Sequence, residues 1–137
     1  MTDAIRNAQA WNDTIYQALT ALDRLQRDGE TPQTVDGETF DDADALRERI
    51  YEMPLSVDVR MGWHTPGASH TLRPCEYQIL LTTGGPALRI VGDLTIGGEP
   101  DTARLEYQDW GTPWTAYTLA QAEEARALDF ASMFFYA

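Results

Sequence analysis

The stretch from Thr82 to Thr115 constrains the fold of this chain more than any other part of its sequence. Three glycine-containing turns, TTGGP, IGGEP and WGTP, separate two short runs that have the alternating or apolar character of strands. Strands joined by such short reversals pair in the antiparallel sense. The stretch therefore predicts a compact antiparallel sheet.

Alternation elsewhere in the chain extends this sheet to four strands. Between Leu55 and Trp63 every second residue is apolar, and the residues between are polar or glycine. Alternate residues of a strand share one face, so this pattern predicts a half-buried strand. We predict strands at residues 55–63, 76–82, 87–94 and 102–110.

Helical periodicity flanks the predicted strands. Apolar residues recur at three- and four-residue steps in the first 28 residues, which is typical of a helix with one buried face. Turn-forming residues without periodicity predict a loop at 30–38. We predict helices at residues 3–28, 40–52 and 118–135, the last opened by a capping box of Thr118 and Gln121.

The resulting order, ααββββα, predicts the α+β class. Residues 1–137 form a single domain in this interpretation, with an antiparallel four-stranded sheet and the helices packed mainly on one face. The segment Phe130–Tyr136 is apolar on more than one side, which indicates burial or, alternatively, a homodimer contact. The residues predicted to be nearly inaccessible to solvent are Ile15, Leu46, Val57, Val59, Ile79, Ile90, Leu105 and Leu128.

Cysteine content and the N-terminal sequence bear on the compartment. Cys75 is the single cysteine, so no intramolecular disulfide can form. The first residues lack the basic and apolar regions of a secretory signal. Together these features lead us to expect a protein of the reducing cytoplasm.

Charge is the outlying feature of the composition. The chain has 22 acidic and 10 basic residues, a formal net charge of −12, and every basic residue is arginine. Such a surface repels nucleic acid and anionic membranes and raises the rate of encounter with basic partners. The alternative interpretation is that the charge serves solubility alone.

Nine of the acids lie between residues 28 and 52, against only Arg47 and Arg49. Like charges four residues apart on a helix, as in the series 44, 48 and 52, destabilise it by a few tenths of a kcal/mol per pair. A row of this kind can imitate the phosphates of a nucleic-acid duplex, although a solvated polar face is the alternative. The predicted partner-binding residues are Asp41, Asp42, Asp44, Glu48 and Glu52.

No other motif predicts chemistry. His64, His70 and Cys75 match no standard zinc spacing, and TTGGP lacks the lysine and following helix of a phosphate-binding loop. We therefore expect no metal, no cofactor and no catalytic residues. Trp110 and Trp114 at a sheet edge are secondary candidates for a stacking platform, which leaves a small-ligand-binding or enzymatic domain, or a structural homodimer, as alternatives.

Three segments, MPLSVDVRMGW, TTGGPALRIVGDL and YQDWGTPWT, resemble parts of small acidic accessory proteins carried by phages and plasmids. The resemblance covers about Met53–Tyr136 and brings no catalytic residues with it. It implies a protein of a mobile element that acts in the cytoplasm of a bacterial host. For an acidic protein of that kind it implies DNA mimicry against a nucleic-acid-binding defence complex, as anti-CRISPR and anti-restriction proteins act.

Overall fold

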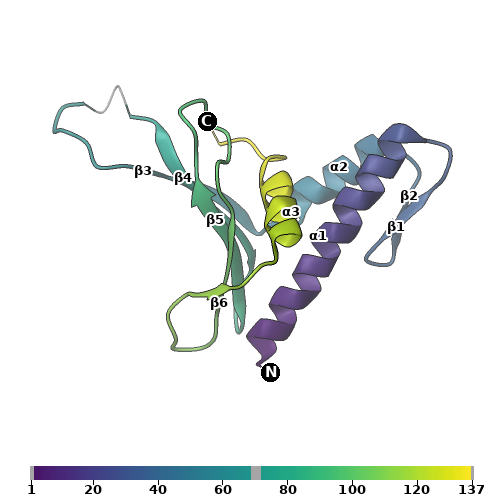
Figure 1. The fold of residues 1–137 in the computed structure, drawn as a ribbon, viewed down its shortest axis with the longest axis horizontal. Coiled ribbons are helices and arrows are strands. Elements are labelled where there is room, and N and C mark those ends of the chain that lie inside the picture. Colours follow the sequence, from purple (N-terminus) through teal and green to yellow (C-terminus); the bar gives the residue numbers. More distant parts are fainter. Residues whose placement is uncertain (1, 69–71, 137) are drawn as a thin grey trace.

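The computed structural model describes residues 2–68 and 72–136. This part of the chain has the predicted α+β class, with three helices, a five-stranded antiparallel sheet and a separate two-stranded sheet. The helices lie together on one side of the five-stranded sheet, and its other side is uncovered (Figure 1). We refer to the uncovered side as the open face.

The main sheet has one more strand than predicted. Its strands follow the order β3-β4-β5-β6-β7, and each neighbouring pair is antiparallel, which confirms the predicted pairing. The additional strand, β7, has only three residues, too few for alternation to be visible in the sequence. The bounds are β3 Ser56–Met61, β4 Pro74–Thr82, β5 Ala87–Asp93, β6 Arg104–Gln108 and β7 Thr115–Tyr117.

A hairpin occupies the segment predicted as a loop, so that prediction and the order ααββββα are wrong there. Its strands are β1, Gln33–Val35, and β2, Glu38–Phe40. Asp36 and Gly37 between them have φ values of 49° and 80°. Positive φ at both central residues is the geometry of a type I′ turn, which favours Asp-Gly because glycine has no Cβ to clash.

The three helices are α1 Asp3–Arg27, α2 Ala43–Glu52 and α3 Gln121–Ala131. Only α1 matches its predicted bounds closely. Helix α2 begins after Asp42, whose carboxylate accepts the Ala45 backbone N–H at 2.7 Å as an N-cap. The Thr118–Gln121 capping box is wrong, because α3 begins after Ala120 instead.

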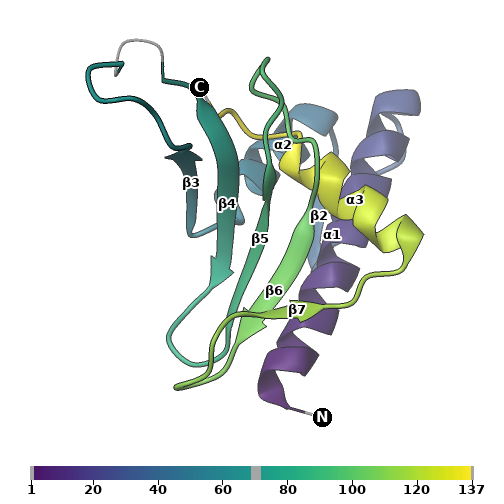
Figure 2. The same ribbon diagram turned by 60° about the vertical axis from the view of Figure 1, so that its left-hand side comes forward.

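The core lies between the helices and the covered face of the sheet. Leu46, Ile79 and Ile90 are fully buried, and Ile15 and Leu105 are at most 3% exposed, as predicted. The prediction for Val59 is wrong, since it is 40% exposed, and Val57 and Leu128 are only half-buried. Alternation identifies which residues share a face, but β3 is an edge strand that extends past the helices (Figure 2).

The C-terminal segment is buried through part of its length. Phe130 is fully buried, Tyr136 is nearly so, and the rings of Tyr136 and Tyr77 lie 5.1 Å apart. Burial raises the pKa of both phenols above their usual value.

A bilayer-spanning helix needs about 20 mainly apolar residues, and no helix in the described part of the chain meets that requirement.

Candidate functional site

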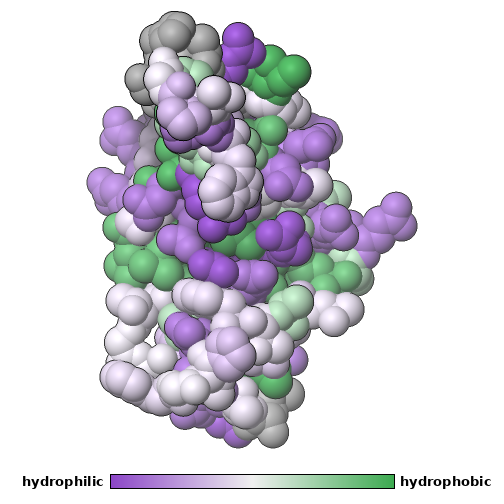
Figure 3. Space-filling model, turned by 90° about the vertical axis from the view of Figure 1, so that its left-hand side faces the viewer, coloured by the Kyte–Doolittle hydropathy of each residue, from purple (hydrophilic) through white to green (hydrophobic). Residues whose placement is uncertain are grey.

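The open face of the sheet carries a shallow polar hollow of about 300 Å³. Hydrophilic side chains run through the middle of this face, with apolar side chains to either side (Figure 3). The hollow is lined by three arginines and three acids, which come from β3, β4, β5 and β6. These residues are Asp58, Arg60, Glu76, Arg89, Arg104 and Glu106.

Arg60 and Glu76 form a two-pronged ion pair between β3 and β4. The Nε and Nη2 groups of Arg60 donate to the two carboxylate oxygens of Glu76 at 3.2 and 2.7 Å. The hydrogen bond from Arg60 lowers the pKa of the Glu76 carboxyl, and the same contact raises the pKa of Arg60. The register of the strands places these residues directly opposite each other.

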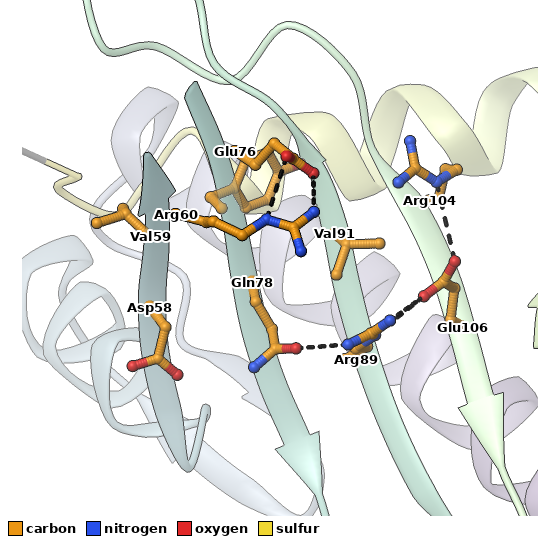
Figure 4. Close-up of a pocket in the computed structure, with 10 residues that line it drawn as sticks. Asp58, Val59, Arg60, Glu76, Gln78, Arg89, Val91, Arg104 and Glu106 are labelled. Carbon is orange, nitrogen blue, oxygen red and sulfur yellow. Dashed lines mark hydrogen bonds and ion pairs between the residues drawn. The ribbon is translucent and has the colours of Figure 1, made fainter. Parts of the chain in front are cut away.

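Arg89 of β5 is the centre of the network drawn in Figure 4. It donates to the Gln78 side-chain oxygen at 2.7 Å on one side and to Glu106 at 2.9 Å on the other. Its guanidinium also stacks over the ring of Trp114, 4.1 Å from the ring centroid. Because these contacts engage all three of its nitrogens and one flat face, Arg89 is largely occupied within the chain.

The two tryptophans singled out from the sequence are placed differently. Trp114 is half-buried and occupied by the stacking contact with Arg89. Trp110 is exposed and lies beside the turn between β4 and β5, where its indole nitrogen approaches Gly85. Of the two rings considered for a stacking platform, Trp110 is exposed to solvent and Trp114 is covered by Arg89.

The predicted partner-binding acids lie on α2 and on the segment that leads into it. Asp41, Asp42, Glu48 and Glu52 line one shallow hollow of about 400 Å³, together with Glu38 of β2. We call this set the acidic surface. Asp44 is exposed but does not line the hollow, whereas Glu38 joins it because the hairpin, missed from the sequence, brings β2 beside α2.

The acids in this region have three different roles. Asp42 caps α2, and Asp44 forms an ion pair with Arg47 at 2.8 Å. Glu38 forms an ion pair with Arg49 at 3.3 Å. The remaining three, Asp41, Glu48 and Glu52, are exposed and make no ion pair with any residue that the structure describes.

The residues considered for a metal site do not assemble into one. Cys75 donates its thiol to the carbonyl of Arg60 at 3.3 Å, and His64 lies 3.4 Å from the carbonyl of Gly62. His70 lies outside the described residues. Within residues 2–68 and 72–136, no three side chains of His, Cys, Asp or Glu come close enough together to hold a metal ion.

Comparisons of this chain with protein-family models, with curated proteins and with solved structures find no significant match.

Proposed function

We propose that this protein is a non-enzymatic interaction protein that binds a basic surface of another protein through the acidic surface. The partner that this chemistry fits is a nucleic-acid-binding protein, whose groove is lined by lysine and arginine. In the setting implied by the sequence resemblance, that partner belongs to a bacterial host defence complex. The chain occupies the groove and carries out no reaction.

One observation carries the proposal. Asp41, Glu48 and Glu52 converge on one hollow, and no ion pair within the described residues neutralises them. Like charges held this close lower the stability of the helix that carries them. A basic partner would remove that cost, and an array of carboxylates offers such a groove the same charge pattern as phosphates do.

The open face supports a ligand-binding function less well. Its charged groups pair with one another, so an incoming charged ligand would have to break an existing contact such as Arg60–Glu76 or Arg89–Glu106. Breaking the Arg89–Glu106 pair is costly, because both side chains are poorly solvated, at 23% and 17% exposed. The acidic surface needs no such exchange.

The proposal is tested by capture from a nuclease-treated bacterial lysate at low ionic strength. The immobilised wild-type chain should retain basic, nucleic-acid-binding proteins. A triple variant, Asp41→Asn, Glu48→Gln and Glu52→Gln, should lose most of that capture, because it removes the three carboxylates of the acidic surface that neither cap α2 nor pair with a described arginine. Most of the loss should be in the association rate.

A matched control separates position from net charge. Asp13→Asn, Glu99→Gln and Glu124→Gln remove the same number of charges from exposed sites on α1, the β5–β6 connection and α3. This control should capture the same proteins as the wild type. Equal capture by the wild type and the first triple variant would contradict the proposal.

A further inference from the structure

The outer edge of β3 is a free edge of the five-stranded sheet. β3 is the first strand of the sheet and pairs with β4 alone. Its other side is not covered by any described part of the chain (Figure 2). A free edge presents unpaired N–H and C=O groups and is a template for another strand.

The side chains of this edge add an apolar row to those backbone groups. Val59 and Met61 alternate along β3 and are both exposed, and the exposed side chains of Leu55 and Trp63 lie just beyond the two ends of the strand. Val57 lies between them and is half-buried. Natural edge strands are usually short or interrupted by charge on such a side, so a continuous exposed apolar row marks an interaction surface.

The sequence of the edge is chemically symmetric about Val59. An antiparallel copy of the strand, with Val59 opposite Val59, places Asp58 opposite the partner's Arg60. The same register places Val57 opposite the partner's Met61, the last residue of β3. Apolar residues thus meet apolar residues on one side of the sheet, and opposite charges meet on the other, twice by symmetry.

Neighbouring registers lack this complementarity. In a dimer with a two-fold axis perpendicular to the sheet, residues directly opposite each other point to the same face of the joined sheet. One strand can therefore slide along the other, away from the Val59–Val59 register, only by an even number of residues. The nearest alternatives place Asp58 opposite Asp58 or Arg60 opposite Arg60. Like charges directly opposite each other destabilise strand pairing, so the edge selects one register for its own copy.

Both charged residues have unused hydrogen-bonding capacity. Arg60 is 75% exposed and uses only its Nε and one Nη group on Glu76, while a guanidinium has five N–H donors. The exposed carboxylate of Asp58 accepts from Ser56 Oγ at 3.3 Å. Each can therefore add a contact across the edge without losing the one it has.

From this geometry we propose that the chain forms a homodimer by antiparallel pairing of β3 with β3 of a second copy. The two five-stranded sheets join into one continuous sheet, and the two open faces become a single surface. This pairing is independent of the acidic surface and goes beyond the proposed function.

Disulfide trapping of the full chain tests the register. In a Cys75→Ser background, Val59→Cys should cross-link rapidly to its own copy, since directly opposite Cα atoms lie about 5 Å apart, within disulfide range. Met61→Cys in the same background should not, because its partner is displaced by four residues, roughly 13 Å. A mixture of the Met61→Cys and Val57→Cys chains should cross-link.

Charge exchange tests the pairing without cysteines, by sedimentation of full-length chains whose folding is checked by circular dichroism. Wild type should be a dimer. Asp58→Arg and Arg60→Asp should each be monomeric, because each places like charges opposite its own copy. An equimolar mixture of the two should form a heterodimer, since every opposed pair is again of opposite sign. Arg104→Asp, a matched change on the same face far from β3, should remain a dimer.

Two results would overturn the proposal. If the wild-type chain is monomeric at every soluble concentration, β3 does not pair with its own copy. An extended segment of another protein is then the partner that fits this edge. Equal cross-linking of Val59→Cys and Met61→Cys, or a dimer that both charge variants retain, places the interface elsewhere on the molecule.

Discussion

On the open face of the sheet, each arginine of the hollow pairs with an acid on the same or the neighbouring strand. On the acidic surface, Arg49 pairs with Glu38 and Asp42 caps α2, while Asp41, Glu48 and Glu52 have neither role in the described chain. Strand register fixes the first arrangement, because it sets opposite charges side by side. The second arrangement has no such internal compensation. The difference indicates that charge on the open face holds the fold together, whereas charge on the acidic surface is available to a partner.

Loss of Arg89 should have the largest effect on stability and so provides the strongest test of this contrast. Arg89→Ala removes the hydrogen bond to Gln78, the stacking on Trp114 and the ion pair to Glu106, whose side chain is only 17% exposed. Leaving this poorly solvated carboxylate with only its longer contact to Arg104, at 3.9 Å, should lower the free energy of unfolding by about 1–3 kcal/mol. Urea denaturation measures this loss. No change would mean that the open face is not a structural network.

The next effect in size comes from Asp42, the acid of the acidic surface that caps α2. Asp42→Ala should lower the free energy of unfolding by about 1 kcal/mol, because the first turn of α2 loses its N-cap. Asp42→Asn keeps a capping oxygen and should be close to wild type. If both variants lose the same stability, the charge of Asp42, and not its hydrogen bond to the Ala45 backbone N–H, stabilises α2.

A smaller effect of opposite sign is expected for the acids without ion pairs. The Asp41→Asn, Glu48→Gln, Glu52→Gln variant should match the wild type or gain a few tenths of a kcal/mol in the same denaturation experiment, because the like charges of Glu48 and Glu52 are removed from one face of α2. A clear loss of stability would show that these carboxylates, like those of the open face, are structural.

The smallest effect concerns Glu76 and depends on pH. The pKa of Glu76 is lower in the folded chain than the usual value of 4.5. The ionised Glu76 carboxylate therefore stabilises the fold above pH 4.5, and this stabilisation is lost as the pH falls through the folded pKa. Wild type should therefore be slightly more stable than Glu76→Gln at about pH 7, and this advantage should shrink as the pH is lowered below 4.5. An advantage that persists in acid would rule out the ion pair with Arg60 as its source.

Local patterns predicted the covered side of the molecule well. The alternation of Ile79 and Ile90 on adjacent strands identified core positions, since both strands lie in the middle of the sheet. The same alternation failed for Val59 because an edge strand can alternate without being covered. The hairpin at Asp36 and Gly37 was missed although Asp-Gly is a strong type I′ signal, because each of its strands is only three residues long.

The candidate site was only partly predictable. Sequence spacing on a helix placed Glu48 and Glu52 on one face, and both line the acidic hollow. It could not separate Asp42, the cap, from Asp41, because that depends on where the helix begins. The network of Arg60, Glu76 and Arg89 was missed entirely, since cross-strand pairs depend on register. Outward residues of alternating sign on adjacent strands were the available signal.

Displacement of captured partners by nucleic acid tests the central claim most directly. Proteins bound to the immobilised wild-type chain are challenged with double-stranded nucleic acid, with the ionic strength held constant so that screening does not change. The account predicts that they are released in proportion to the nucleic acid added, because both compete for one basic groove. Partners that remain bound at saturating nucleic acid would contradict it.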